Sequence, residues 1–310
     1  MSFSYEKIVR HYENPLVQKE IASFCRGKWV GIHCETFDEH GRRVLVRYFK
    51  KRGKKIPLRI DDSSSLGRLL RFYGELKPRS IYATANVYGK LDSEEDVVTL
   101  SNVKACMPTW DIDNKPENWD ATVQTIHEVV SMLESNGITK SYFVKFSGRG
   151  AHVHVHPYAI SREVRLEHNP LDLAWAMVEY IREKISLKVA DFARRFKAES
   201  LRVDNEIDPQ RLFISPLSVH REEAKVSVCI NPNKLDSFNP ETDANLEGFK
   251  HFEGWNVWVE GEADSLALKA YNYIGGFPTL PRVRKRKHPP LDKQILSWLS
   301  KLDSEKQGLG

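Results

Sequence analysis

Cysteines and long apolar runs are scarce in this sequence, and both absences narrow what the chain can be. Only four of the 310 residues are cysteine, and no two of them form a C-x-x-C pair. That spacing argues against a zinc site and against a disulfide framework, so we expect idle thiols and no bound zinc. No apolar run approaches the roughly 20 residues that a membrane-spanning helix needs, which predicts that the chain has no membrane partner.

The start of the chain lacks the apolar core of a secretory signal, and we therefore expect a cytoplasmic protein. Internal repeats and low-complexity segments are also missing. Its 41% of hydrophobic and 29% of charged residues are typical of a globular protein with a sizeable core. Such a chain is built as one large domain or as two small ones.

The excess of basic charge lies at the C-terminal end. The formal net charge is +5, and residues 282–310 hold eight Lys/Arg against three acidic residues, so the remainder is neutral. A basic arm suits attraction to the phosphate backbone of nucleic acid, although a solubilising tail is an equal alternative. The nucleic-acid-binding candidates are Arg284, Lys285, Arg286 and Lys287. The tail, over residues 279–310, ends in a predicted amphipathic helix.

Apolar spacing along the rest of the chain predicts two modules. The first, over residues 1–105, combines a long helix over residues 5–24 with several strands and a further helix. The second, over residues 106–278, follows the order β-α-β-β-α-β, which is typical of a split βαβ, ferredoxin-like sheet. We therefore predict an α+β fold in which the two modules form one domain over residues 1–278.

Acidic residues alternate along two of the predicted strands. Asp111 and Asp113 are two residues apart, so their side chains share one face. Carboxylate oxygens are ligands that Mg²⁺ and Mn²⁺ prefer, and two such ions held together can serve phosphoryl transfer. Asp204, Glu206 and Asp208 alternate in the same way, and we expect Asp204 to complete the site from a second strand. The predicted catalytic and metal-binding residues are therefore Asp111, Asp113 and Asp204.

A basic loop with two glycines, residues 147–150 (SGRG), joins two later strands. Glycines let the backbone approach a ligand, and consecutive N–H groups can form an anion-binding nest. Arg149 offers a fork of donors to phosphate oxygens, and His152 follows on the next strand. His154 and His156 share the face of His152. A three-histidine metal site is one reading of this strand, but a structural role for His154 and His156 is preferred.

Taken together, these pieces resemble the archaeo-eukaryotic primase superfamily, and most closely the small (catalytic) subunit of archaeal replicative primases. The resemblance covers roughly residues 5–275. Its motifs appear in order: a Val-Arg-Tyr strand at residues 46–48, the run over residues 79–83, the Asp-x-Asp, the Ser-Gly-(basic)-Gly-x-His, and a Val-Asp…Arg-Leu…Pro-x-Ser-x-His block. The last block contributes Ser218 and His220.

This resemblance implies a primase-type catalytic fold, in which an RRM-like antiparallel sheet packs with a smaller N-terminal α/β unit. It also implies two-metal nucleotidyl transfer with Mg²⁺ or Mn²⁺, on a DNA template and primer, from NTP or dNTP substrates. The three aspartates match the metal carboxylates of the family. The nucleotide-binding positions are Arg47, Ser147, Arg149, His152, Ser218 and His220.

Three features depart from the archaeal pattern. Archaeal small subunits usually carry a Cys/His zinc motif, whereas residues 114–140 hold no Cys and only His127. The glycine loop is one residue shorter than the common form. Ile214 stands where a basic phosphate contact is usual, so a nearby cation such as Lys145 or Arg211 would have to take its place. Bacterial end-joining polymerase domains share the superfamily and also lack the zinc motif.

The sequence therefore favours the catalytic subunit of a DNA primase, an enzyme that makes or extends primers. A gap-filling end-joining repair polymerase of the same superfamily is the alternative. A metal-dependent nuclease leaves the basic glycine loop unexplained, and a non-catalytic nucleic-acid-binding subunit leaves the three carboxylates unexplained. The expected protein partner is a primase large subunit in the first case and a repair ligase in the second.

Overall fold

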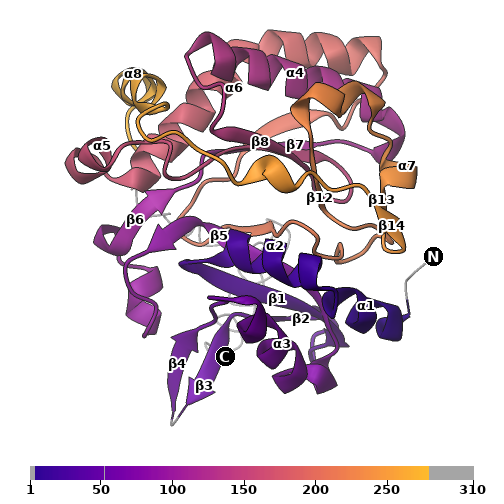
Figure 1. Ribbon diagram of the computed structural model, residues 1–310. Helices are drawn as coiled ribbons and strands as arrows, with labels where there is room; N and C mark the ends of the chain where they lie inside the picture. The colour runs from indigo at the N-terminus through magenta and orange to yellow at the C-terminus, as the bar shows by residue number, and fades with distance from the viewer. Residues whose placement is uncertain (1–3, 52, 279–310) are drawn as a thin grey trace, which may run out of the picture. The chain divides into compact units, whose positions relative to one another are not determined.

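Two five-stranded antiparallel sheets organise the computed structural model, which describes residues 4–51 and 53–278 (Figure 1). The predicted basic tail, its four nucleic-acid-binding candidates and its amphipathic helix lie outside the described residues. Sequence and structure agree on an α+β fold with antiparallel pairing in both sheets.

The first sheet has the strand order β11-β5-β1-β2, and β6 also pairs with β5. Its strands are β1 (Lys28–Phe37), β2 (Arg43–Val46), β5 (Pro78–Tyr88), β6 (Val103–Cys106) and β11 (Leu212–Ile214). β11 comes from the predicted second module but pairs with β5, with Phe213 opposite Ala83. The two predicted modules therefore share a sheet, and their boundary near residue 105 stays a prediction.

The predicted single helix over residues 5–24 is wrong, because the chain forms two helices there. α1 (Tyr5–Tyr12) ends before Asn14, and α2 (Pro15–Cys25) begins after it. The Asn14 side chain accepts a hydrogen bond from the Leu16 N–H at 2.9 Å, and Pro15 occupies the first helical position, where its missing N–H costs nothing. Apolar spacing continues across this break, which is why periodicity alone merges the helices.

A short hairpin and one more helix complete the N-terminal part. β3 (Tyr48–Lys51) pairs with β4 (Lys54–Pro57) around Gly53, whose φ of 78° is one that glycine adopts without strain. This confirms the turn that the basic cluster at residues 50–55 indicated. α3 (Ser63–Phe72) follows and packs against α2.

The second sheet confirms the predicted β-α-β-β-α-β order. Its strands, in sheet order, are β10 (Arg202–Asn205), β7 (Thr109–Asp113), β9 (Ala151–Val155), β8 (Tyr142–Phe146) and β12 (Val228–Ile230). α4 (Trp119–Ser135) lies between β7 and β8 in the chain, and α6 (Pro170–Arg195) lies between β9 and β10. The first and third strands of the motif are therefore adjacent in the middle of the sheet, as in a split βαβ unit.

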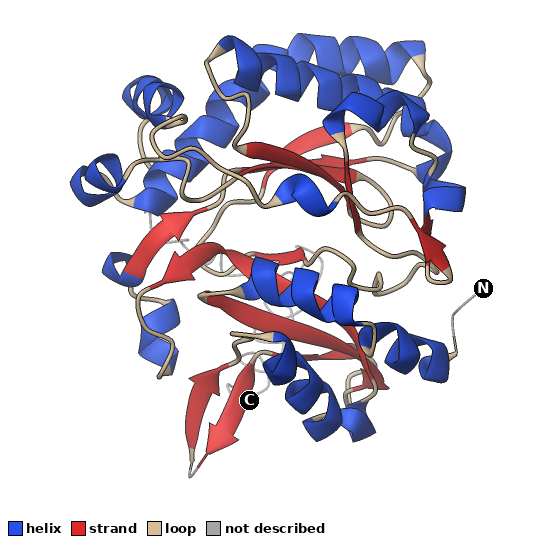
Figure 2. Cartoon of the chain, viewed as in Figure 1, coloured by secondary structure: helices blue, strands red, loops and turns tan. Residues whose placement is uncertain are grey.

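α4 and α6 run side by side over one face of the second sheet, as Figure 2 shows. Trp110 points to this face: it is fully buried, and its indole Nε1–H donates to the Val178 carbonyl of α6 at 3.1 Å. Because side chains alternate along a strand, Asp111 and Asp113 lie on the opposite, helix-free face. That alternation positions the candidate site.

The remaining elements are short, apart from α8. They are α5 (Arg162–Glu167), α7 (Pro240–Asp243), the paired β13 (Ala244–Asn245) and β14 (Gly248–Phe249), and α8 (Asp264–Ile274), which packs against α6. One continuous buried apolar cluster takes in residues from both large sheets, including Ile32 and Val153. In the described part of the chain, no helix combines the length and the apolar character that crossing a membrane requires.

Candidate active site

A pocket of about 650 Å³ brings together residues from both sheets. His33, Leu45 and Tyr82 come from the first sheet, and β7 and β9 of the second sheet supply the opposite wall. Seven of the nine predicted catalytic and nucleotide-binding residues line this one pocket: Arg47, Asp111, Asp113, Ser147, Arg149, His152 and His220. They are up to 173 residues apart in the chain, since the first is 47 and the last is 220.

The three aspartates lie on one face of the second sheet. In the antiparallel pairing of β10 with β7, Asp204 is directly opposite Asp111, and Arg202 is opposite Asp113. Residues opposite each other in such a pair project to the same side. Asp111 is buried and Asp113 is half exposed, so the cluster reaches from the interior to the open pocket. Asp204 itself does not line the pocket.

Two arginines neutralise these carboxylates: Arg202, which the sequence reasoning missed, and Arg211, which it named as a stand-in cation for position 214. Arg202 contacts both Asp113 and Asp204, the latter through its Nε at 2.6 Å from Oδ2. Arg211 lies 3.6 Å from an Asp111 oxygen and pairs with Glu206 at 2.6 Å. Arg202 could have been found from the strand period that picked out Asp204, since the two are two residues apart. Arg211 matches the notion of a stand-in cation, because it lines the pocket beside Ile214.

The proton affinities of the two β7 aspartates are shifted in opposite directions. Burial raises the pKa of Asp113, the charges of Asp111 and Asp204 raise it further, and Arg202 opposes them. Burial also acts to raise the pKa of Asp111, but His152 and then Arg211 and Lys145 outweigh it, and the net shift is downward. Mutual repulsion among carboxylates on one face is the condition that a bound cation relieves.

Asp111 and Asp113 have the oxygen donors that a hard divalent cation prefers, whereas Asp204 is not placed with them as a third ligand. Oxygen donors from Asp111 and Asp113 share a face and an open pocket. Within the described residues, however, no group of three His, Cys, Asp or Glu side chains is assembled as a metal site. Arg202 contacts both Asp113 and Asp204, so its guanidinium occupies carboxylate oxygens that a cation would need. A cation held by all three aspartates would therefore require Arg202 to release Asp113 and Asp204.

The glycine loop is a tight connection between β8 and β9 that only small residues allow. The Ser147 N–H donates to the Gly150 carbonyl at 3.0 Å, which closes the loop. A Cβ on Gly150 would lie 2.1 Å from the Ile112 carbonyl oxygen, and one on Gly148, whose φ is 118°, would lie 2.5 Å from the His220 ring. The glycines thus let the loop press against β7 on one side and against His220 on the other.

Arg149 is held at the mouth of the pocket by two acidic neighbours. Its Nε lies 2.7 Å from a Glu223 oxygen and its second terminal nitrogen lies 2.8 Å from Glu222. All three side chains are partly exposed. An anionic ligand would have to take Arg149 from these glutamates, which follow His220 in the sequence and which the sequence reasoning missed.

His220 is set to donate a hydrogen bond from its outer nitrogen. The backbone N–H of Glu223 donates to the ring Nδ1 at 2.9 Å, so a neutral ring carries its proton on Nε2. Burial, with Arg149 as the next cause, lowers the pKa of His220 to about 4. The imidazole is therefore neutral at physiological pH and presents Nε2–H as a donor for a phosphate oxygen.

His152 and His154 on β9, and His156 directly after it, have different contacts. His152 lies 3.3 Å from Asp111, burial lowers its pKa, and its Nδ1 has no hydrogen-bond partner within the described residues. His154 is fully buried, with Nδ1 2.8 Å from the Thr109 hydroxyl. His156 stacks on Trp258 and lines a different pocket. They do not share a metal site, which leaves the structural role preferred for His154 and His156.

Ser218 is not part of the pocket. It is fully buried, and its hydroxyl accepts a hydrogen bond from the Ile81 N–H at 2.7 Å, so it fixes the turn before His220 to β5. Ser218 thus has a buried, structural position, and its binding of nucleotide stays a prediction. Lys145 is not free to stand in for a basic residue at Ile214, because it is fully buried and its ammonium donates to the Ile214 carbonyl.

Arg47 lies at the far wall of the pocket. Its guanidinium stacks over Trp29 at 3.5 Å from the ring centroid and donates to the Gln210 carbonyl at 2.9 Å. Its Nε has no partner within the described part of the chain. A stacked, oriented guanidinium is a rigid donor for an anionic or carbonyl ligand group.

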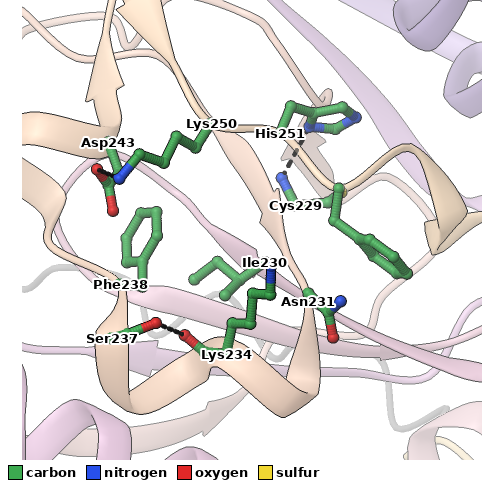
Figure 3. Close-up of a pocket in the computed structure, with 10 residues that line it drawn as sticks. Cys229, Ile230, Asn231, Lys234, Ser237, Phe238, Asp243, Lys250 and His251 are labelled. Atoms are coloured by element: carbon green, nitrogen blue, oxygen red, sulfur yellow. Dashed lines mark hydrogen bonds and ion pairs between the residues drawn. The ribbon is translucent and has the colours of Figure 1, made fainter.

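A second pocket, of about 460 Å³, contains none of the predicted residues (Figure 3). It lies beside β12, where Lys250 pairs with Asp243 at 2.8 Å and the Cys229 N–H donates to the His251 ring at 3.1 Å.

Comparison with solved structures agrees with this architecture. The polymerase domain of Mycobacterium tuberculosis Ligase D, in complex with DNA, aligns over 88% of this chain and 90% of its own length, at 11% identity and a TM-score of 0.53. The AEP domain of the cyanophage S-2L primase-polymerase aligns over 77% of this chain and 100% of its own length, at 15% identity and a TM-score of 0.32, too low to support a shared fold. No protein-family model and no curated protein matches the sequence. The chain therefore has the α+β fold of a primase-type polymerase domain.

Proposed function

We propose that the chain is a DNA-dependent nucleotidyltransferase that makes or extends primers from nucleoside triphosphates, as the catalytic subunit of a DNA primase does. One observation carries the proposal: the pocket places an aspartate pair beside a basic glycine loop and a donor histidine. A metal-dependent nuclease would need the aspartates, but it would not need a basic glycine loop and a donor histidine to bind a triphosphate beside them.

In this proposal the chain's own residues bind and orient the triphosphate. His220 donates from Nε2, residues 148–150 of the glycine loop offer their backbone N–H groups, and Arg149 supplies a charged fork once it leaves Glu222 and Glu223. Arg47 would hold the opposite end of the nucleotide. Catalysis of this type consists mainly of positioning and of stabilising charge where it develops.

The metal ligands in this proposal are Asp111 and Asp113, with Asp204 as the third carboxylate. Two divalent ions, Mg²⁺ or Mn²⁺, would activate the attacking hydroxyl and neutralise the leaving pyrophosphate when bound. Asp111 is suited to such a role because it stays ionised, with its pKa below the ordinary value. Arg202 would have to release Asp113 and Asp204 before their carboxylates could hold a cation.

A template-directed incorporation assay tests the proposal. Single-stranded DNA, with and without an annealed primer, is incubated with Mg²⁺ or Mn²⁺ and with NTPs or dNTPs. Incorporation should follow the template and should fall by roughly a thousandfold or more in the Asp111→Asn and Asp113→Asn variants, which keep their size and should keep their fold. Retained incorporation by either variant, or cleavage of DNA without nucleotides, would refute the assignment.

A gap-filling repair polymerase is the second candidate, and a specific observation favours it. The neighbour that shares the fold over 88% of this chain is the polymerase domain of a ligase, and it was solved with DNA. The same assay separates the two candidates. Product from an unprimed template supports a primase, which would work with a large subunit; a strict need for an annealed end supports repair alongside a ligase.

A further inference from the structure

A separate, aromatic-walled pocket of about 210 Å³ lies at the other end of β1, β8 and β9. It shares no lining residue with the candidate active site. Five of the residues that line it have aromatic side chains: Phe24, Phe143, Tyr158, Trp255 and Trp258. At roughly 30 Å³ per water molecule, it has room for about seven waters, which suits one planar ring system and excludes a duplex.

Lys28 is the unusual member of this pocket. Its residue is 4% exposed, and its Nζ contacts only soft groups, the Met107 sulfur at 3.8 Å and the Phe24 ring at 4.0 Å from the centroid. No carboxylate pairs with it within residues 4–51 and 53–278. Burial lowers its pKa to about 8, so the group is still mostly charged at neutral pH. A buried ammonium without a counter-ion is costly, and an anionic ligand would remove that cost.

The aromatic walls are held in place by buried hydrogen bonds. Trp258 stacks flat on His156, with ring centroids 4.1 Å apart and an angle of 1° between the planes. The His156 ring is in turn fixed by Asn256 at 3.1 Å and by the Tyr158 N–H at 3.3 Å. Trp255 donates its indole N–H to the buried Glu20. Rigid, flat walls of this kind favour a planar ligand.

A ligand would enter past Trp258, which is 44% exposed and lines the open side of the pocket. Arg26, which is also exposed and lines the pocket, adds a second positive charge. The pocket therefore offers a stacking lip, flat inner walls and a buried cation. Stacking on aromatic side chains combined with a cationic contact is how proteins hold single nucleotides without reading their sequence.

We propose that this pocket binds one nucleotide unit, with its base against Trp258 and the inner aromatic walls and its phosphate at Lys28. The nucleotide is either a free nucleoside monophosphate or an unpaired unit of a DNA strand, which share this chemistry. The proposal does not rest on the reaction proposed for the other pocket, because the two pockets have separate walls.

Calorimetric titration of the full chain with deoxyadenosine monophosphate tests the proposal. The Arg149→Ala/His220→Ala variant serves as the background, so that binding at the candidate active site does not contribute. We expect binding that weakens at least tenfold in Lys28→Met and in Trp258→Ala. Lys234→Met, at the edge of the second pocket, is the matched control and should change nothing. Since Trp258 is at the lip, its variant keeps the test valid if Lys28→Met fails to fold.

The ligand series decides which part of the nucleotide is recognised. Deoxyadenosine should bind more weakly than its monophosphate, and its affinity should be the same in the Lys28→Met variant. Inorganic phosphate alone should bind weakly. Competition by an unpaired oligodeoxyadenylate identifies a strand as the source, and its failure identifies the free nucleotide. Equal binding by the background and the Lys28→Met variant, or no binding of the monophosphate at millimolar concentration, would overturn the proposal.

Discussion

Arg149 and Arg202, two arginines of the candidate active site, already have partners of opposite charge. Arg149 is held by Glu222 and Glu223, and Arg202 is held by Asp113 and Asp204. Binding of a metal-triphosphate would exchange these internal pairs for pairs with the ligand. If the proposed function holds, these internal pairs compete with the triphosphate, and their strength sets part of its apparent affinity.

Removing the acidic partners of Arg149 should therefore tighten nucleotide binding. Partly exposed ion pairs are worth about 0.2–1 kcal/mol each, so the loss of both pairs in the Glu222→Gln/Glu223→Gln double variant should lower KM for the triphosphate by about twofold to thirtyfold. Steady-state incorporation kinetics measure this change. Glu241→Gln, which breaks the exposed pair with Lys225 elsewhere, is the control and should leave KM as it is. A KM unchanged in the double variant would show that Arg149 does not meet the triphosphate.

A buried histidine, His156, and a partly buried one, His220, should make the fold sensitive to acid. Burial lowers the pKa of both His156 and His220 from 6.5 to about 4. Between these values the unfolded chain binds protons that the folded chain does not, so stability rises with pH across this window and is lost as pH falls. The free energy of unfolding should drop by up to about 1.4 kcal/mol per pH unit for each histidine.

Urea unfolding at several pH values between 4 and 7 checks this slope. His156→Gln and His220→Gln should each flatten the dependence, and the double variant should flatten it most. If the double variant kept the slope of the unsubstituted chain, neither histidine would be neutral in the folded state at pH 5 to 6.

At the scale of elements, the hairpin of β8 and β9 brings the loop to the carboxylates. Its close approach to β7 depends on Gly150, because a Cβ there would lie 2.1 Å from the Ile112 carbonyl oxygen. Backbone, unlike a flexible side-chain end, cannot move aside cheaply. Position 150 is therefore where a single methyl group should disturb both stability and binding.

Gly150→Ala should destabilise the fold by about 1–3 kcal/mol, the usual cost of overpacking, and should weaken triphosphate binding as the loop shifts. Thermal unfolding and nucleotide titration measure the two effects. Gly74→Ala is the matched control, since a Cβ there would meet nothing within 4 Å. Equal stability of the two variants would mean that the loop is not pressed against β7.

The elements also show what a sequence can and cannot predict. The alternation of Asp111 and Asp113 and the β-α-β-β-α-β order were sufficient to foresee the second sheet and the face that the two aspartates share. The same periodicity merged α1 with α2, because apolar spacing runs across Asn14 while a local cap decides the break. Partners from distant segments, such as Arg211 beside Asp111, follow from tertiary packing and carry no local pattern.

At the scale of the whole molecule, the candidate active site exists because one late segment returns to the first sheet. β11 pairs with β5 and carries Phe213 against His152, so both sheets contribute walls to one pocket. The chain up to Phe277 forms one unit. The excess positive charge of the sequence lies after it, and its role remains the prediction made from the sequence.

Neutralising that charge should weaken DNA binding without altering the fold. Replacing Arg284, Lys285, Arg286 and Lys287 by Gln should lower the slope of log affinity against log salt by up to about 3.6, because each phosphate contact contributes roughly 0.9. Fluorescence anisotropy with labelled duplex DNA, at salt concentrations from about 50 to about 200 mM, measures this slope. An unchanged slope would identify the tail as solubilising only.

In the proposed function, the aspartate pair and the glycine loop form one site for a metal-bound triphosphate. Electron paramagnetic resonance of Mn²⁺ tests this directly, by titrating the ion with and without a non-hydrolysable nucleoside triphosphate. We expect the triphosphate to raise Mn²⁺ affinity by about tenfold or more, a coupling of roughly 1.4 kcal/mol, and we expect Asp113→Asn and Arg149→Ala each to abolish the coupling. Mn²⁺ affinity that is indifferent to the triphosphate would contradict it.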